Sequence, residues 1–541
     1  MSFARLTPAR AAVGLSLLVS AAHVAVLQGF FPSPFQDDAY ISLRYARNLA
    51  TGAGLVFNPG ERVEGFTNPL WTLIAAAALA LKLKGTLTLL VLGVACYAGL
   101  IVSAGRLGAE SSLHPRYRAL IPLLTGASTA TAYWSLTGME TVPFAWAVLE
   151  GLRHALRAAR TRSCGDPWMG LCFGVAALLR PEAVGYFGLL LGVLAVHAWR
   201  GGARPRPDAA LVGCLLAFGA LVGAYQVFRL SYYGAWLPNT FYAKVEAHGA
   251  FARGLQYVGK GALSGALGFL LVPVFAARRA WARPELFVPA SLVAFHLLYV
   301  VAVGGDYMKF GRFLIPVLSP AAVLWAAAMD ALGVDDTGAW RSPRIRAASL
   351  AFIALTFTAG LAPFITGHDE LRTVRSVENY RAIGRWIAAW VPPETLVATP
   401  AIGAIGYLGH TRILDTLGLV DPWLSHHRDP HVDGADFAAG HARGDADYVL
   451  RRQPAIVFFA GVWLAAEPLT PTTILRRLDS LWLSDRLLLR KPEFFQQYEI
   501  VNYRFQGGWL GLALRRGSRC HPDHPSYRGP VPALRGRQPG A

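Results

Sequence analysis

The sequence predicts a polytopic α-helical membrane protein with about 11 spans, followed by a soluble α/β domain. Only 16% of the 541 residues are charged and 54% are hydrophobic, whereas soluble domains carry about 25% charged residues. Apolar runs with about the 20 residues needed to cross a bilayer lie near 11–30, 86–106, 209–228, 285–303 and 348–366. These features exclude a soluble enzyme, a disordered chain and a disulfide-linked scaffold.

The first apolar run follows Arg5 and Arg10, as the apolar part of a signal peptide would. Because no small-residue cleavage motif follows it, we expect a retained first span. Shorter apolar stretches farther along the chain predict the remaining spans. These lie over about 119–135, 141–158, 167–179, 183–199, 261–277 and 312–330.

A polar stretch over about 31–67 separates the first two long apolar runs and is too long for a tight turn. Its apolar side chains recur at helical spacing beside two arginines, which predicts an amphipathic helix at the membrane interface. The residues that carry this pattern are Tyr40, Leu43, Arg44, Arg47 and Leu49. Glycines and a proline after residue 51 then predict a loop.

Residues 68–83 decide the topology, because this stretch is only just long enough to span. If it stays on the outer side, 18 of the 30 Lys and Arg residues in 1–366 lie inside, against 11 if it crosses. The excess of cations in cytoplasmic loops favours the first arrangement. We therefore expect 68–83 to be re-entrant or interfacial, the N-terminus to lie inside, and residues 367–541 to lie outside.

The chain after residue 366 has the pattern of a soluble domain. Short apolar strands at 396–399, 412–414 and 455–459 alternate with helical stretches such as 377–390, which predicts an α/β fold. The Arg-, Gly- and Pro-rich end after about 516 is expected to be a flexible tail. The predicted domains are thus 1–366, with a catalytic first outer loop over about 31–85, and 367–541.

The net charge of +18 does not indicate a nucleic-acid partner. Most of the basic excess lies beside apolar runs, where cations encode topology and contact membrane lipids. The five cysteines show no CxxC spacing, so neither a zinc site nor a disulfide framework is expected. No residues are assigned to a metal.

Acidic residues are rare in the membrane half, so those expected on the outer side are candidates for a functional site. Asp37 and Asp38 lie at the outer end of the first span, where paired carboxylates suit base catalysis or a divalent cation. The alternative is that they only cap the following helix. The other outer acids are Glu61, Glu64, Glu140, Glu182, Glu246 and Asp306.

Residues 35–71 resemble the first outer loop of membrane glycosyltransferases of the GT-C type. The segment runs from Phe35-Gln-Asp37-Asp38 through Gly54-Leu-Val-Phe57 to Thr67-Asn68-Pro69-Leu-Trp71. It is most similar to terminal arabinofuranosyltransferases that use polyprenyl-phosphate sugar donors. Weaker similarity continues through the segments that contain Gly138-Met-Glu140, Arg180-Pro181-Glu182, Leu237-Pro238-Asn239, Gly304-Gly305-Asp306 and Gly403-Ala-Ile-Gly406.

The resemblance implies that an acid of the first outer loop is the general base for the acceptor hydroxyl. The matching positions are Asp37 and Asp38, and we expect unequal roles because two adjacent like charges raise one pKa. The family match favours Asp37 slightly. Glu140 is expected to shape the site as a second acid, its alternative being a cap on span 141–158.

The donor implied by the resemblance leaves as polyprenyl phosphate, so cations are expected near it. Lys244, Lys309 and Arg312 are candidates for binding the phosphate, and snorkelling at the interface is the alternative for each. The remaining substrate-binding candidates come from the same motifs. They are Arg44, Glu61, Arg62, Glu64, Asn68, Asn239, Tyr242 and Asp306.

Three other motifs are weaker indications of a functional site. The His426–Asp433 segment has metal-ligand residue types, but no fixed helix aligns them, so a solvated loop is expected. Gly403, Gly406 and Gly409 do not match the dinucleotide fingerprint and indicate a turn or close packing. Arg180 and Glu182 flank a proline, and this motif predicts either a cavity wall or a turn with a local ion pair.

Together these features predict a GT-C glycosyltransferase of the bacterial cytoplasmic membrane, with its site and C-terminal domain on the outer side. It would move one sugar from a polyprenyl-phosphate donor to a cell-envelope glycan or lipid-linked acceptor, with inversion. No cofactor is implied, and a divalent cation is left open. The alternatives are a lipid or polysaccharide transporter, which should show paired repeats, and a non-catalytic envelope assembly subunit.

Overall fold

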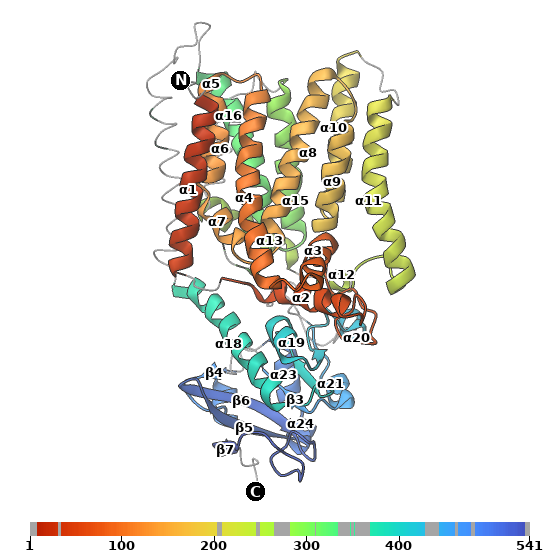
Figure 1. Ribbon diagram of the computed structural model, residues 1–541, viewed down its shortest axis with the longest axis vertical. Coiled ribbons are helices and arrows are strands. Elements are labelled where there is room, and N and C mark those ends of the chain that lie inside the picture. The colour runs from red at the N-terminus through yellow and green to blue at the C-terminus, as the bar shows by residue number, and fades with distance from the viewer. Residues whose placement is uncertain are drawn as a thin grey trace.

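The computed structural model describes residues 8–30, 34–202, 208–244, 249–264, 282–308, 310–333, 347, 351, 368–427, 443–459, 464–477 and 482–535. Figure 1 shows a bundle of long helices with an α/β domain beneath one end of it. Helices α2 (Asp37–Ala50) and α3 (Pro69–Ala80) lie between the two parts. The start of α1 (Pro8–Phe30) and the C-terminal domain lie at opposite ends of the bundle, as the topology prediction requires.

The bundle is built from apolar helices close to the predicted spans. Besides α1 they are α4 (Gly85–Glu110), α8 (Thr141–Thr161), α9 (Pro167–Leu179), α10 (Ala183–Arg200), α11 (Ala209–Tyr233), α15 (Pro284–Ala302) and α16 (Ile315–Gly333). Among the described residues, six helices are long and apolar enough to cross a membrane. The expected spans 261–277 and 348–366 lie almost entirely outside the described residues, so the number 11 stays a prediction.

The stretch predicted as one span over 119–135 forms two short helices rather than one continuous helix, and a third short helix precedes it. The preceding helix is α5 (Pro115–Arg118), and the two helices of the stretch are α6 (Leu120–Gly126) and α7 (Thr129–Ser135). The Ser128 side chain accepts a hydrogen bond from the Thr131 N–H and caps α7. The Tyr97 hydroxyl donates to the Gly126 carbonyl, 3.0 Å away, at the end of α6. These polar groups satisfy helix ends that a continuous helix would not expose, so the stretch is an interrupted helix, and its crossing of the membrane stays a prediction.

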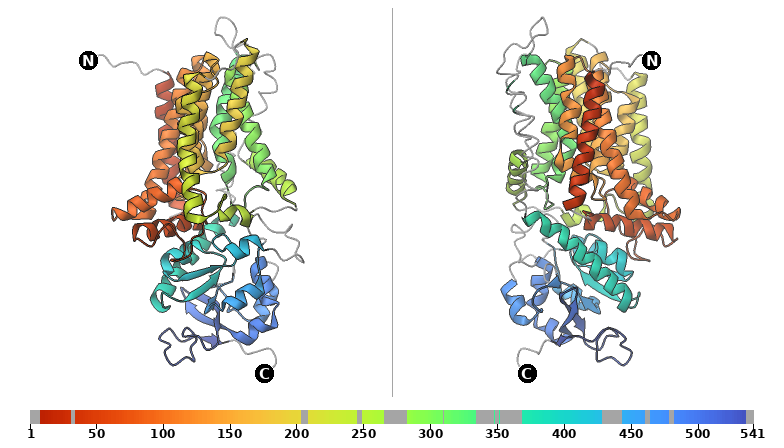
Figure 2. Two further views of the ribbon diagram at one scale, coloured as in Figure 1. Left: turned by 90° about the vertical axis from the view of Figure 1, so that its right-hand side faces the viewer. Right: turned by 60° about the vertical axis from the view of Figure 1, so that its left-hand side comes forward.

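Helix α2 forms where an amphipathic helix was predicted, and it packs between other elements of the protein. Most of its 14 residues are buried, because α2 packs against α3 on one side and α19 (Gly403–Gly409) on the other. Helix α3 has 12 residues, about 18 Å of helix, which is too short to span. Figure 2 shows α2 and α3 at the domain end of the bundle, so residues 68–83 do not cross it.

The C-terminal domain contains the three predicted strands within a larger mixed sheet. The strands are β1 (Leu396–Thr399), β2 (Arg412–Asp415), β3 (Ile456–Val457), β4 (Leu464–Ala465), β5 (Tyr498–Phe505), β6 (Gly508–Arg515) and β7 (Leu534–Arg535). Their order is β2-β1-β3-β6-β5-β7, and β4 pairs with β6. Strands β1, β2 and β3 are parallel, whereas β5, β6 and β7 pair antiparallel.

Alternate residues of the parallel strands face two different layers of helices, as the strand period of two requires. Val397 and Ile413 face α18 (His368–Trp390), which includes the predicted helix 377–390, and α19. Ala398 and Leu414 face the opposite layer. That layer includes α21 (Ala446–Arg452), α23 (Leu483–Leu489) and α24 (Pro492–Gln497). The domain also contains the short helices α20 (Pro422–His426) and α22 (Pro471–Arg477).

The end of the chain is more ordered than a flexible tail. Strand β7 pairs with β5, and the Arg535 guanidinium lies 2.7 and 2.6 Å from the two carboxylate oxygens of Glu499. Cys520 and His521 are buried. These contacts hold residues 516–535 against the sheet, so the predicted tail was wrong for that stretch, and residues 536–541 lie outside the described part.

Candidate active site

A cavity of about 380 Å³ opens at the domain end of the bundle, where the first outer loop meets the ends of the long helices. Its walls come from α2, the segment before α3, the α9–α10 turn, α12 (Asn239–Lys244), the end of α15 and the 3₁₀ turn η2 (Arg312–Leu314). Its polar lining consists of Asp38, Ser42, Thr67, Asn68, Glu140, Arg180, Glu182, Thr240, Lys244, Tyr299 and Arg312. Segments far apart in the sequence thus bring acids, cations and amides into one space.

The two adjacent acids of α2 point to different neighbours. Asp38 lines the cavity. The carboxylate of Asp37 accepts hydrogen bonds from the backbone N–H groups of Gly403, at 3.1 Å, and Ala404, at 2.7 Å. Successive residues on a helix point about 100° apart, so both acids cannot face the same pocket. Asp37, the slightly favoured base, contacts the C-terminal domain instead.

The surroundings of Asp37 change its acidity. Loss of hydration on burial, together with the neighbouring Asp38 charge, raises the pKa of Asp37 to about 6, although its bonds to Ala404 and Gly403 oppose the rise. The side chain bonds to α19 rather than to the N–H groups of its own helix, and α2 has no side-chain cap at Gln36. The helix-cap alternative therefore does not describe Asp37.

Glu140 is held in the cavity wall by two partners. The Asn68 amide donates to Glu140 across 2.8 Å, and the Arg180 guanidinium lies 3.4 Å from its other oxygen. Arg180 also pairs with Glu182 at 2.6 Å. The Ser42 hydroxyl donates to the side-chain amide oxygen of Asn68 at 3.1 Å, which connects this network to α2. Glu140 makes no side-chain cap on α8, contrary to the alternative considered for it.

The Arg180–Pro181–Glu182 motif has both of the features predicted for it. Arg180 and Glu182 form a local ion pair, and the motif lines the cavity. These two charged residues were absent from the predicted substrate-binding set. The signal that could have included them is a charged pair about a proline at the outer junction of two apolar helices.

Two cations reach the cavity from the opposite wall. Arg312 is buried and forms a bidentate pair with Asp306, with nitrogen–oxygen distances of 2.6 and 3.1 Å. Lys244 lies at the end of α12 and is exposed to the cavity. Desolvation by the surrounding protein lowers the pKa of Lys244, while the Asp38 charge opposes this shift. Lys309, the third candidate, lies outside the described residues.

Three candidates of the first outer loop lie away from the cavity lining. Arg44 is buried, and its guanidinium donates to four oxygens, two of them backbone carbonyls of the C-terminal domain. Glu61 pairs with Arg412 at 2.6 Å, and the Arg62 guanidinium lies 4.8 Å from the centre of the Tyr232 ring. The structure thus gives these charges roles in packing, which their residue types alone did not reveal.

Glu64, Asn239 and Tyr242 also face protein partners. Glu64 is buried against Arg229 at 2.6 Å. The Asn239 amide donates to carbonyls of the C-terminal domain, and the Tyr242 ring packs on His426 with centroids 4.4 Å apart. Their neighbours line the cavity, which explains why the motif pointed to them. Of the His426–Asp433 segment, only residues 426 and 427 are described, so the loop prediction lies mostly outside the described part.

The described residues also bring Glu499, His521 and Asp523 within 4.8 Å of one another in the C-terminal domain. Arg535 pairs with Glu499 and Asp523 there, at 2.6 and 2.7 Å, so an ion-pair cluster accounts for them. Arginines balance Glu140 and Glu182 of the cavity lining, and Asp306 beside it, in the same way. Such pairing reduces the charge that these carboxylates offer to a divalent cation.

Comparison with known proteins identifies a matching family, sequence relatives and solved structures with a similar fold. Residues 369–520 match a family described as a domain of unknown function, DUF8728. A terminal beta-(1->2)-arabinofuranosyltransferase of Corynebacterium glutamicum is 28% identical over 396 residues, which is 64% of this chain and 54% of that protein. The Mycobacterium tuberculosis protein of the same name is 28% identical over 417 residues, which is 67% of this chain and 64% of that protein. The chain therefore spans between about half and two thirds of the length of these curated relatives.

Among solved structures, ArnT from Cupriavidus metallidurans bound to undecaprenyl phosphate matches with a TM-score of 0.56 and 14% sequence identity. The match covers 93% of this chain and 98% of ArnT. The apo structure of ArnT matches with a TM-score of 0.50. The chain thus has the ArnT-like GT-C fold, and the predicted resemblance to GT-C glycosyltransferases and arabinofuranosyltransferases is confirmed.

Proposed function

We propose that this protein is a membrane glycosyltransferase that moves one sugar from a polyprenyl-phosphate donor to a cell-envelope glycan or a lipid-linked acceptor. The observation that carries the proposal is the cavity in which Asp38 faces Lys244 and Arg312 at the domain end of the bundle. The names of the arabinofuranosyltransferase relatives and the ArnT-like fold support the same reaction class.

In the proposed reaction, Asp38 accepts the proton of the acceptor hydroxyl as its oxygen attacks the anomeric carbon. The bond between that carbon and the phosphate oxygen breaks, and polyprenyl phosphate leaves with the bonding electrons. Lys244 and Arg312 stabilise the charge on the leaving phosphate, because charge-assisted hydrogen bonds are strong where water is scarce. A single displacement inverts the anomeric centre.

Asp38 replaces Asp37 as our proposed base, since Asp38 lines the cavity whereas both oxygens of Asp37 accept backbone N–H groups. Asn68, Glu140, Arg180 and Glu182 form the wall beside it. The reaction as written needs no metal. Transfer is therefore expected to persist in EDTA, and loss of activity that Mg²⁺ or Mn²⁺ restores would assign a divalent cation to the site.

The direct test is a reaction of the purified protein with synthetic polyprenyl-phosphate arabinofuranose and an arabinan oligosaccharide. We expect elongated glycan and an equal amount of polyprenyl phosphate. A transporter would move the donor across a vesicle membrane without cleaving it, and a non-catalytic assembly subunit would produce neither product. Intact donor with several sugars and acceptors would therefore contradict the proposal.

We further propose that the protein lies in the bacterial cytoplasmic membrane with the cavity and the C-terminal domain on the outer side. The charge distribution around the apolar runs supports this orientation. The opposite positions of the α1 start and the C-terminal domain in Figure 1 agree with it.

A further inference from the structure

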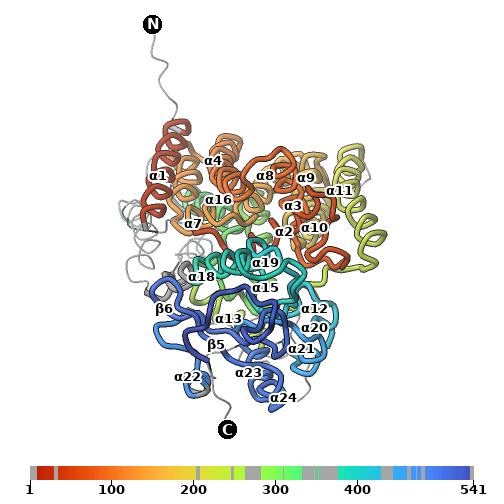
Figure 3. Tube along the Cα trace, turned by 60° about the horizontal axis from the view of Figure 1, so that its bottom comes forward, coloured from red at the N-terminus to blue at the C-terminus, as the bar shows by residue number. Residues whose placement is uncertain are grey.

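The C-terminal domain shares its hydrophobic core with the first outer loop. One continuous cluster joins the buried side chains of this loop to the β1–β2 face of the sheet and to α19. The loop contributes Ile41, Tyr45, Leu55, Phe57 and Phe66 to that cluster. Figure 3, with the domain end forward, shows α19 beside α2. Burial of several large apolar side chains across one boundary resists separation of the two parts.

The contact is closest at the start of α2, one residue before the proposed base. Gly403 lies so near that a Cβ atom there would be 1.9 Å from the Asp37 carbonyl oxygen. The Asp37 carboxylate accepts the N–H groups of Gly403 and Ala404. Backbone of the C-terminal domain therefore fixes the first turn of α2, whose next side chain is Asp38.

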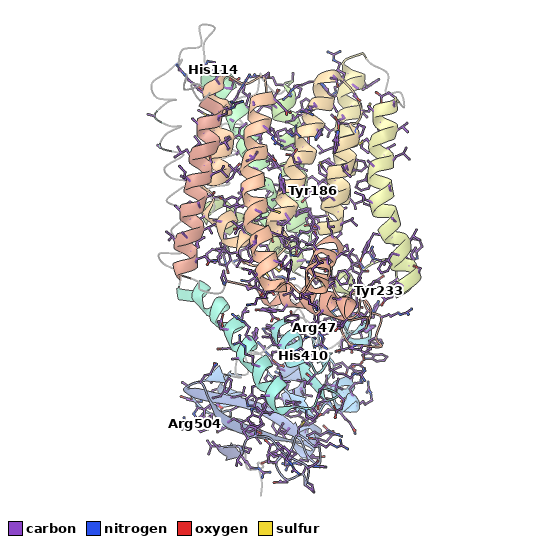
Figure 4. All side chains as sticks on the ribbon, viewed as in Figure 1. Arg47, His114, Tyr186, Tyr233, His410 and Arg504 are labelled. Atoms are coloured by element: carbon purple, nitrogen blue, oxygen red, sulfur yellow. The ribbon has the colours of Figure 1, made fainter. Side chains whose placement is uncertain are left out.

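Two arginines extend this contact along α2. Arg44 donates to the carbonyl oxygens of Gly406 and Thr411, each 2.7 Å away. Arg47 lies 2.9 Å from the His410 ring nitrogen, and Figure 4 shows both labelled side chains at this boundary. Because Arg44 is buried, its fixed bonds define the position of α2 more strictly than surface ion pairs would.

The same domain also holds the opposite wall of the cavity. The Asn239 amide donates to the carbonyl oxygens of Gly418 and Leu419, at 2.8 and 3.0 Å, and accepts from the Ser425 hydroxyl at 2.8 Å. Asn239 begins α12, the helix that ends at Lys244. Arg443 donates to the carbonyl oxygen of Ala243 at 3.2 Å, directly before Lys244.

We propose that the C-terminal domain sets the relative position of Asp38 and Lys244, acting through the positioning residues Asp37 and Asn239. The roles of Asp38 and Lys244 rest on the proposed function, whereas the contacts do not. A shift of about 1 Å between reacting groups costs about 10²-fold in rate. Domain contacts on both α2 and α12 would control that separation, and this is the function that we assign to the matched domain.

The test compares Asp37→Ala and Asn239→Ala in the full-length protein, with hydrogen–deuterium exchange and kinetics measured on the same samples. Arg412→Ala is the matched control, because it removes an exposed ion pair between the same loop and domain. We expect faster exchange over 37–50 in Asp37→Ala and over 239–244 in Asn239→Ala, with unchanged exchange over β5 and β6. The control should change neither segment.

The kinetics should separate the two positioning residues. Asp37→Ala should lower kcat at least tenfold with little change in the KM for donor, and Asn239→Ala should raise the donor KM at least tenfold. Asp37→Asn, which keeps one acceptor oxygen, should recover part of kcat and serves if the alanine variant fails to fold. Partial recovery also distinguishes positioning from base catalysis, because asparagine cannot accept the proton.

Two results would overturn the inference. One is normal exchange over 37–50 with kcat abolished equally in both Asp37 variants, which would make Asp37 the base. The other is normal kcat and KM despite faster exchange. If the wild-type protein transfers no sugar, the proposed function fails, and the exchange measurements alone decide whether the domain orders α2 and α12.

Discussion

At the scale of single residues, adjacent acids with similar sequence signals have different surroundings. Asp38 lines the cavity, whereas Asp37 binds the backbone of α19. The sequence predicted unequal roles because like charges cannot easily share one pocket. The sequence could not assign these roles, because the N–H groups that bind Asp37 belong to Gly403 and Ala404. These two residues follow Asp37 by 366 and 367 positions.

Lys244→Ala should raise the apparent KM for donor by about tenfold or more, which corresponds to about 1.4 kcal/mol. The reason is the loss of a charge-assisted bond to the donor phosphate. Lys84→Ala is the control, because Lys84 is an exposed cation outside the cavity lining. Steady-state kinetics at varied donor concentration measure the effect, and an unchanged donor KM in Lys244→Ala would remove this lysine from the phosphate site.

The raised pKa of Asp37 predicts a pH-dependent stability difference. A folded-state pKa of about 6, above the unfolded value of about 3.9, means that the folded protein holds this proton more tightly. The contribution of Asp37 to the free energy of unfolding therefore falls as pH rises from about 4 to about 6. Asp38 is the neighbouring charge, while burial raises the pKa values of Tyr40, to about 12, and Tyr380, so both stay neutral.

The measurement is the Tm of the wild type and of Asp37→Asn in the same detergent between pH 4 and pH 7. Because asparagine does not titrate, the wild-type Tm minus the variant Tm should decline over this interval. A difference that is constant or grows with pH would contradict the assigned direction.

At the scale of elements, hydrophobic pattern identified most helices, because a membrane span needs a long apolar run. The same pattern did not predict the break within 119–135, where Ser128 and Tyr97 provide hydrogen bonds for helix ends that an apolar count does not register. It also missed the burial of α2, because its polar residues satisfy partners in the C-terminal domain. Positions that depend on distant backbone cannot be read from local periodicity.

The turn before α8 offers a test at this scale. Gly138 has a φ of +74°, and a Cβ there would lie 2.1 Å from the Phe35 ring. Its carbonyl accepts from the Trp71 indole at 2.8 Å, while the carbonyl of Thr137 accepts from the Gln36 N–H at 3.0 Å. This turn therefore ties the starts of α2 and α3 to the segment that carries Glu140.

Gly138→Ala should lower kcat at least tenfold, because the added methyl group must displace Phe35 next to the acids of α2. Gly60→Ala is a matched control, since Gly60 also has a positive φ but no atom lies within 4 Å of a Cβ there. Both variants strain the backbone, but only Gly138→Ala places a methyl group against the Phe35 ring. Comparing kcat and Tm for the two variants therefore separates the effect of strain from that of the Phe35 contact. Equal effects would show that the Phe35 contact does not matter.

At the scale of the whole molecule, the count of cations predicted an arrangement in which 68–83 stays on one side, and the fold has this arrangement. Figure 2 shows the C-terminal domain against the same end of the bundle as α2 and α3. The sequence did not predict that this domain would contribute to the cavity boundary through Leu419. That contact brings together segments about 350 residues apart, for which a single sequence contains no local signal.

The orientation in the membrane is testable with cysteine labelling in intact cells, compared with the unmodified protein. An impermeant maleimide should label cysteines introduced at Pro59 and Gln506, which are exposed at the domain end. It should not label cysteines at Arg116 and Thr161, which are exposed at the other end. The reverse pattern would place the cavity on the cytoplasmic side.

The central claim is that Asp38 in this cavity drives sugar transfer from a polyprenyl-phosphate donor. The decisive measurement is a single-turnover reaction with labelled polyprenyl-phosphate arabinofuranose, comparing the wild type with Asp38→Asn after gel filtration confirms folding. The wild type should give one polyprenyl phosphate per transferred sugar and an inverted anomeric centre. Asp38→Asn should bind the donor but transfer about 10²–10⁴ times more slowly. Transfer by Asp38→Asn at the wild-type rate would contradict the account.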